Sequence, residues 1–244
     1  MKSIKNTLTA LSLVPTLILI SLMGMPALAE KMDDNLFTLV KIDQLEYRKQ
    51  DGNDLLVWDG QGRIGNDENK FTLKTEGEYV RNADEFENAE VQLRYQRLIS
   101  DFFDAHVGVR QDIKPDPSRT FGVIGVNGLA PQWFETDASF FVSHKGDTSL
   151  RLEAEYDILF TQRLVLEPSA ELDIAFSNDE KTGVGSGLSK VELGLRLRYE
   201  ITRKFAPYIG INWEKKIGKT EDFATEEGED TDVFSLVAGL RLFF

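Results

Sequence analysis

The sequence predicts an all-β protein, an antiparallel transmembrane β-barrel of the bacterial outer membrane with about 12 strands. Long segments alternate apolar and polar residues with a period of two, which sorts side chains onto the two faces of a strand. These segments run for about ten to thirteen residues, whereas soluble strands average about five or six and membrane-crossing strands need about nine to eleven. The connections between them alternate between short and long, as in single-chain outer-membrane barrels.

A secretory signal peptide is expected over residues 1–29. Two lysines precede an apolar run that a proline interrupts and that is too short for a membrane-spanning helix. Small residues stand at the two positions that a signal peptidase reads. We therefore expect cleavage between Ala29 and Glu30, a short periplasmic segment over residues 30–36, and a barrel over residues 37–244.

The strand pattern is clearest in residues 149–160. Even positions there are apolar, while the odd positions 151–157 carry one arginine and three acidic residues. A helix would scatter these residues around its circumference, so the pattern indicates a strand. Proline cannot donate to a ladder, so the strand that contains Pro168 should bulge or bend there. The twelve expected strands cover residues 37–48, 54–64, 70–80, 87–99, 103–113, 119–128, 132–143, 149–160, 164–176, 191–201, 205–217 and 234–244.

Connection lengths predict the orientation of the barrel. Every second connection is short, and the two longest, residues 177–189 and 218–231, have the opposite parity. Because periplasmic turns are short in such barrels, we expect both termini at the periplasmic side. A secreted β-sandwich also alternates apolar and polar residues. The strand lengths, the aromatic residues at strand ends and the final Phe244 favour the barrel.

The composition excludes several classes of function. Lys and Arg number 28 against 41 Asp and Glu, a formal charge of −13, so nucleic acid is not an expected partner. The chain has no Cys and 2 His, which excludes thiolate metal sites and thiol nucleophiles. No enzyme motif stands out, and we expect a monomeric barrel in contact with outer-membrane lipid and lipopolysaccharide.

Six strings along the chain are distinctive. They are MDDNL at residues 32–36, LKTEGEY at 73–79, VNGLAPQWFETDAS at 126–139, RLEAEYDILFTQRLVLEP at 151–168, GVGSGLSKVELGLRLRYEI at 183–201 and FAPYIGINWEKKIGKTEDFA at 205–224. These strings resemble the copper resistance protein B family. The resemblance implies an outer-membrane barrel that serves copper tolerance, with copper ion as the bound or transported metal and with periplasmic copper-binding proteins as partners.

The chain departs from the family in its N-terminal segment. Many members carry a segment rich in Met and His before the barrel, whereas residues 30–36 contain one methionine, Met32, and no histidine. Cu(I) prefers thioether, thiolate and imidazole ligands, so Met32, His106 and His144 are the candidates. The strand pattern places His106 in the lumen near the periplasmic mouth, where it could form a transient copper site with Met32 or stay a solvated histidine. His144 is expected in a surface turn.

Luminal carboxylates are the larger potential resource for metal binding. Glu153, Glu155 and Asp157 repeat on one face, about 6.5–7 Å apart, and oxygen ligands could hold Cu(II) loosely. Arginines such as Arg151 and Arg163 could pair with them instead. Two alternatives therefore stay open, a cation path and a lumen plugged by its own ion pairs. The corresponding functions are a copper-handling barrel and a non-selective structural or diffusion barrel without a specific metal site.

Overall fold

The computed structural model describes residues 36–50 and 52–244. The chain divides into two compact units, Met1–Asp33 and Asp34–Phe244, and the described residues belong to the second. The predicted signal peptide, the cleavage site between Ala29 and Glu30, and Met32 lie outside the described residues, so those predictions stay untested.

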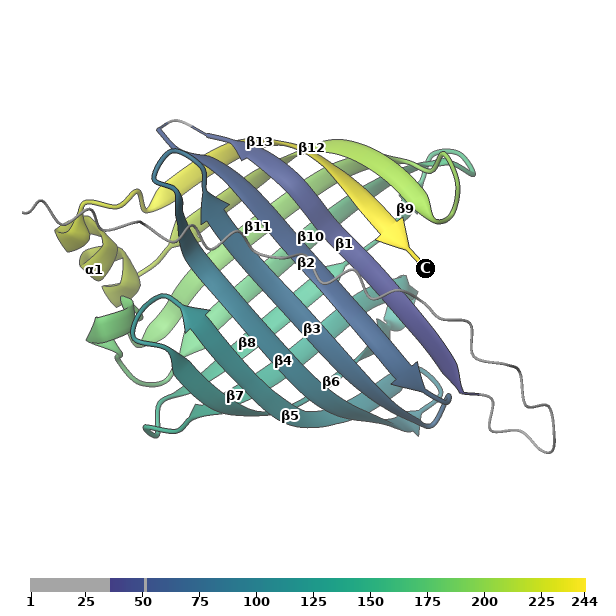
Figure 1. The fold of residues 1–244 in the computed structure, drawn as a ribbon, viewed down its shortest axis with the longest axis horizontal. Coiled ribbons are helices and arrows are strands. Elements are labelled where there is room, and N and C mark those ends of the chain that lie inside the picture. Colours follow the sequence, from purple (N-terminus) through teal and green to yellow (C-terminus); the bar gives the residue numbers. More distant parts are fainter. Residues whose placement is uncertain (1–35, 51) are drawn as a thin grey trace, which may run out of the picture. The chain divides into compact units, whose positions relative to one another are not determined.

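The described residues fold into one antiparallel sheet that closes on itself (Figure 1). Each strand pairs with its neighbours in the sequence, except that β8 and β9 both pair with β10, and β1 pairs with β13 to close the ring. Backbone hydrogen bonds of 2.8 and 2.9 Å join Val40 and Phe244 at this seam. The strands are β1 (Phe37–Lys49), β2 (Asp54–Gly65), β3 (Asn69–Val80), β4 (Glu85–Ser100), β5 (Phe103–Lys114), β6 (Arg119–Ala130), β7 (Phe134–Ser143), β8 (Thr148–Glu155), β9 (Ile158–Leu159), β10 (Leu164–Ala175), β11 (Gly187–Tyr199), β12 (Phe205–Lys216) and β13 (Asp232–Phe243).

The predicted fold class is confirmed. The thirteen labelled strands make up twelve barrel strands, because β8 and β9 are two parts of one strand. Both pair with β10 in a single register, in which Ser169 faces Glu155 and Leu166 faces Ile158. The ladder is interrupted only between these pairs, next to Pro168. Of the predicted bulge or bend in the proline's own strand, the bulge was wrong, since β10 pairs with β11 without a shift at Pro168. The missing donor instead interrupts the neighbouring strand.

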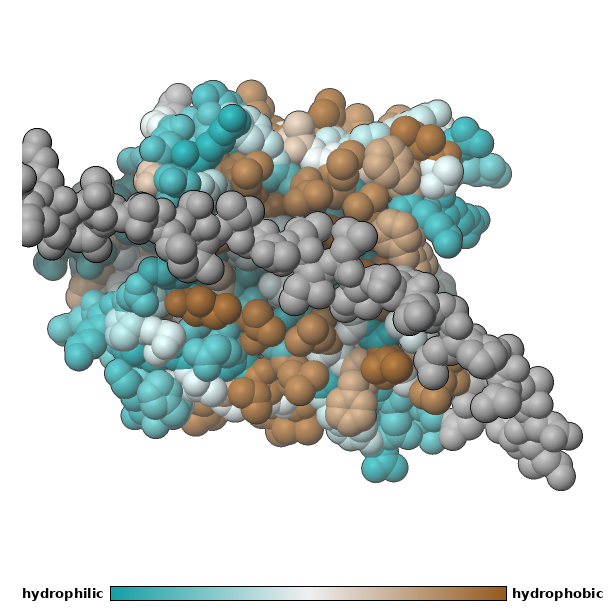
Figure 2. Space-filling view, viewed as in Figure 1, coloured by the Kyte–Doolittle hydropathy of each residue, from teal (hydrophilic) through white to brown (hydrophobic). Residues whose placement is uncertain are grey.

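The barrel is apolar outside and polar inside. Large apolar side chains such as Leu93 (56% exposed) and Ile124 (61% exposed) face outward, and Figure 2 shows them gathered on the middle of the wall with hydrophilic residues towards both ends. Buried charged residues face inward, among them Glu46, Glu90 and Arg196. This inverted polarity suits a wall surrounded by lipid.

The two ends of the barrel differ as predicted. Short turns join β2 to β3, β4 to β5, β9 to β10 and β11 to β12 at one end, the short-turn end, where a 3-10 helix, η1 (Pro131–Trp133), joins β6 to β7. The opposite, long-loop end carries η2 (Glu180–Thr182) and the helix α1 (Lys219–Glu227), which stops at Gly228 in the left-handed conformation. Across residues 36–50 and 52–244, no helix is long and apolar enough to span a membrane.

Candidate functional site

Two buried glutamates organise the charged interior of the barrel. Glu46 on β1 is 2% exposed and accepts hydrogen bonds from the Arg196 guanidinium at 3.0 Å, Arg48 Nε at 2.7 Å and the Tyr208 hydroxyl at 2.9 Å. Gly239 makes room for this cluster, since a Cβ there would lie 2.6 Å from the Tyr208 hydroxyl oxygen. The glutamate thereby joins β1, β11 and β12.

Glu90 has the same role on β4, three places from β1 in the ring. It is 1% exposed, and Arg110 Nη2 lies 2.7 Å from one of its oxygens. Arg151 on β8 approaches Glu90 to 3.3 Å, Glu76 to 3.2 Å and Asp173 to 3.1 Å. A single guanidinium therefore links β3, β4 and β10 to its own strand.

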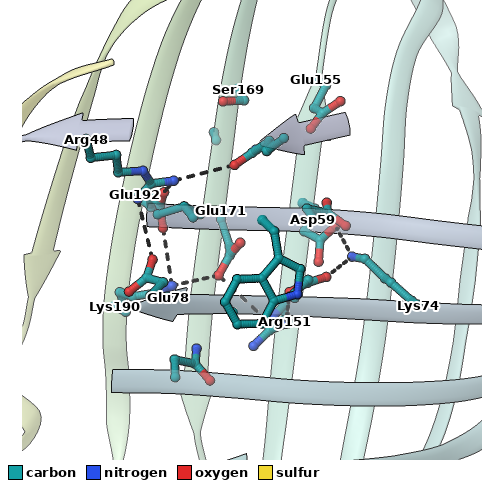
Figure 3. A pocket seen from close by; sticks show the side chains of 18 of the residues that line it. Arg48, Asp59, Lys74, Glu78, Arg151, Glu155, Ser169, Glu171, Lys190 and Glu192 are labelled. Carbon is teal, nitrogen blue, oxygen red and sulfur yellow. Dashed lines mark hydrogen bonds and ion pairs between the residues drawn. The ribbon is translucent and has the colours of Figure 1, made fainter. Parts of the chain in front are cut away.

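Alternating acidic and basic side chains continue from Arg151 around the lumen (Figure 3). Successive contacts join Arg151 to Glu171 at 3.8 Å, Glu171 to Lys190 at 2.9 Å, and Lys190 to Glu192 at 3.3 Å. Arg48 then approaches Glu192 to 3.0 Å and Glu78 to 3.5 Å, which returns the path to β3. We call this set the ion-pair ring: Arg48, Glu76, Glu78, Arg151, Glu171, Lys190 and Glu192.

The lumen contains a small cavity and a wider one. The central chamber has a volume of about 90 Å³. The vestibule, of about 470 Å³, lies towards the long-loop end, where residues of α1 and of the connection between β10 and β11 line it. Four residues line both cavities and so mark their boundary: Glu78, Asn88, Arg151 and Lys190.

The structure separates the three carboxylates that the sequence singled out. Glu153 and Glu155 line the central chamber, where Lys74 Nζ lies 3.4 Å from Glu153 and also contacts Glu76. Asp157 lies in the gap between β8 and β9, pairs with Arg198 at 2.8 Å and lines neither cavity. Two of the three carboxylates therefore line one chamber, and the third lies outside both cavities.

Two further charged residues, Arg163 and Asp59, lie in different surroundings. Arg163, a proposed luminal counterion, is exposed in the short turn before β10. Asp59 lines the chamber, and its buried Oδ1 has no hydrogen-bond partner within the described part of the chain. Among residues 36–50 and 52–244, no group of three or more His, Cys, Asp or Glu side chains is placed to hold a metal ion.

His106 faces inward as predicted, but its ring is buried against side chains of the neighbouring strands rather than solvated. It is 3% exposed, with Nε2 at 3.1 Å from Ser139 Oγ and Nδ1 at 3.3 Å from Asn127 Oδ1. Gly125 leaves space for the ring, because a Cβ there would lie 2.6 Å from Nε2. The expected partner Met32 lies outside the described residues, and His144 is exposed in the turn between β7 and β8.

The serine beside His106 does not supply a nucleophile. Ser139 Oγ donates to Asp137 Oδ1 at 2.5 Å, and Ser139 is 1% exposed. A nucleophilic serine needs its proton directed to the histidine base and an open approach to its oxygen. Arg94 holds Asp137 at 2.7 Å, so the group acts as a packed polar cluster.

Sequence reasoning missed several of the residues that organise the lumen. Glu46, Glu90, Asp59 and Asp137 all lie at inward positions of the strand alternation, so parity could have placed them in the lumen. Parity does not give their partners, because Glu46 and Arg196 are 150 residues apart in the sequence.

A closed barrel with an apolar outer face and a charged interior defines this chain as an outer-membrane β-barrel. The NanC porin structure has the same fold, with a TM-score of 0.54 and 11% identity over 84% of this chain and 99% of that one. The KdgM porin in complex with disordered oligogalacturonate gives a TM-score of 0.50 and 10% identity, again over 84% of this chain and 99% of that one. These likenesses concern the fold alone.

The family is shown by sequence comparison. The family model described as "Copper resistance protein B precursor" matches residues 36–244. Copper resistance protein B of Escherichia coli is 45% identical over 206 residues, which cover 84% of this chain and 69% of that protein. The copper resistance protein B homolog of Pseudomonas syringae pv. tomato is 44% identical over 202 residues, 83% of this chain and 68% of that protein. The chain belongs to the copper resistance protein B family, as its strings indicated, and is a protein of the outer membrane.

Proposed function

We propose that this barrel serves copper tolerance by binding or passing copper ions at the outer membrane, in cooperation with periplasmic copper-binding proteins. Membership of the copper resistance protein B family is the observation that carries the proposal. In this role copper is the cargo of the barrel rather than a resident cofactor.

The charge of the central chamber supports a cationic cargo. Seven acidic and five basic side chains line it, and a cleft with an excess of one charge raises the local concentration of the opposite ion. Carboxylate oxygens suit Cu(II) better than Cu(I), which prefers sulfur and imidazole. The acidic residues are Asp59, Glu76, Glu78, Glu153, Glu155, Glu171 and Glu192, and the basic ones are Arg48, Lys74, Arg151, Lys190 and Arg196.

A second candidate is a non-selective structural or diffusion barrel without a specific metal site. The ion pairs inside the barrel favour it, because several chamber carboxylates already pair with the protein's own cations. The packing of His106 against Ser139 and Asn127 also leaves no imidazole directed into the chamber.

Purified barrel in liposomes distinguishes the two candidates. Copper, zinc and sodium uptake and the copper retained per barrel would be measured side by side, with growth of an expressing strain in copper as the cellular readout. Selective copper uptake or retention supports the proposal. Equal passage of all three ions, with no copper retained, contradicts it and supports the diffusion barrel.

Variants of the chamber test which residues matter. Glu153→Gln with Glu155→Gln removes two chamber carboxylates and should lower copper retention, whereas Asp157→Asn on the same barrel strand is a matched control because Asp157 lines neither cavity.

Joint substitution of Met32 and His106 tests the predicted site of soft copper ligands. Unchanged copper per barrel and unchanged growth would remove that pair from the mechanism.

A further inference from the structure

Two ion pairs cross the lumen between nearly opposite strands. Arg151 and Glu153 lie on β8, while their partners Glu76 and Lys74 lie on β3, five places away in the ring. The contacts are 3.2 Å for Arg151 with Glu76 and 3.4 Å for Lys74 with Glu153. Side chains that meet from opposite walls occupy the path along the barrel axis.

Arg151 lies where the vestibule meets the central chamber. It lines both cavities, its side chain is 8% exposed, and its guanidinium carbon lies 5.8 Å from the ring centre of Phe141, which is 1% exposed. Four carboxylates surround it, the farthest at 3.8 Å. The side chain is thus fixed by contacts on several sides.

Arginine is suited to this position because its positive charge is permanent. A guanidinium stays charged throughout the range in which proteins function, so deprotonation does not release it. Removing it from Glu76, Glu90 and Asp173 exposes these carboxylates to each other's repulsion unless another cation takes its place.

We infer that Arg151 closes the lumen between the vestibule and the central chamber, and that a cation crosses the barrel only by taking the place of its guanidinium among the surrounding carboxylates. Arg151 thereby determines what the lumen admits: cations can compete for this position, and anions and neutral solutes cannot. This inference concerns the passage of any ion, so it goes beyond the proposed role in copper tolerance.

Ionic current in planar bilayers tests the closure in potassium chloride, without copper. The charge-balanced variant Arg151→Gln with Glu76→Gln should raise the current per barrel by about threefold or more, since it removes two charged side chains that meet across the lumen. Glu90 still has Arg110 as a partner, 2.7 Å away in the wild type, which should limit the loss of stability. Arg151→Lys retains the charge and should stay near the wild-type current.

Lys216→Gln is the matched control, because Lys216 lines the vestibule but pairs with Glu229 at 2.7 Å rather than across the lumen. Current in the double variant that equals the wild type would overturn the inference. If that variant does not fold, liposomes that contain the wild-type barrel are placed in a solution of an uncharged sugar. No swelling is expected, and rapid swelling would show that the lumen is open and would overturn the inference. A barrel that retains no copper but gives the expected currents would contradict the proposed function and leave this inference intact. The two proposals can therefore be contradicted separately.

Discussion

Buried charge in this barrel is tolerated where one carboxylate receives several donors. Glu46 accepts hydrogen bonds from two arginines and a tyrosine, all within 3.0 Å. Taking a carboxylate and two guanidinium groups out of water is expensive, and only this density of charged hydrogen bonds offsets the desolvation. Single residues such as Glu46 and Glu90 therefore fix how distant strands meet inside the barrel.

Glu46→Ala should destabilise the folded barrel by about 3–5 kcal/mol, because it leaves Arg48 and Arg196 buried without their shared carboxylate. The measurement is urea unfolding in lipid vesicles, followed by tryptophan fluorescence. Asp116→Asn is the control, since Asp116 is 73% exposed and its loss should change stability by less than about 0.5 kcal/mol. Equal effects of the two variants would refute the role of Glu46.

The long-loop end contains a pH-dependent contact between the first residue of β6 and the connection between β10 and β11. Arg119 holds Asp179 with hydrogen bonds of 2.7 and 3.0 Å, and these bonds keep the pKa of the Asp179 carboxyl below its usual value of 3.8. A lowered pKa means that the contact stabilises the fold above pH 3.8 and is lost as the pH falls through the lowered value.

Asp179→Asn should therefore remove a stabilisation of about 1 kcal/mol at pH 7 and remove the acid-dependent opening of the connection between β10 and β11. Limited proteolysis of that connection from pH 7 down to about pH 2, with a protease active at each pH, measures the effect in wild type and variant. A wild-type connection that is equally cleaved at every pH would contradict it.

At the scale of elements, Pro168 in β10 interrupts the barrel strand beside it, which is split into β8 and β9. Pro168 lies opposite Tyr156, whose backbone N donates to the Pro168 carbonyl at 3.1 Å. Because paired antiparallel residues exchange two hydrogen bonds, the reciprocal bond is missing for want of a donor on proline. The pairs on both sides keep one register, so no residue is inserted between β8 and β9.

Pro168→Val should consequently fuse β8 and β9 into one strand. Hydrogen exchange at residues 156–159 should slow, because the new donor completes the ladder there. Pro207→Val is a suitable control: Pro207 faces Leu240 within an unbroken ladder between β12 and β13, and its replacement should leave exchange at residues 156–159 unchanged. Unaltered exchange in Pro168→Val would show that another contact keeps the two strands apart.

The strands were predictable because each depends on a local pattern, and the luminal network was not because it depends on the closed ring. Alternation around residues 149–160 identified a strand and its inward face without knowledge of its neighbours. One partner of Arg151, in contrast, is Glu76 on a strand nearly opposite, which only the number and order of strands can bring close. The helix α1 was also missed, since its polar residues show no apolar period.

At the scale of the whole molecule, the barrel reverses the arrangement of a soluble protein. Its ladder hydrogen bonds are closed around the ring, its charges pair in the interior, and its apolar side chains form the outer wall. In lipid every backbone polar group must be satisfied within the protein, which a closed barrel achieves. Stability should therefore respond to outward substitutions according to their depth in the bilayer.

Leu93→Arg and Ile99→Arg test this dependence on depth within one strand. Both side chains face outward on β4, with Leu93 near the middle and Ile99 next to the short-turn end. An arginine at the middle of the bilayer should destabilise the barrel by about 2–4 kcal/mol, whereas one at the interface should cost about 0–1 kcal/mol because it reaches water and headgroups. Urea unfolding in lipid vesicles measures both, and in detergent micelles the difference should shrink. Equal losses for the two variants in lipid would contradict the membrane position that the apolar wall implies.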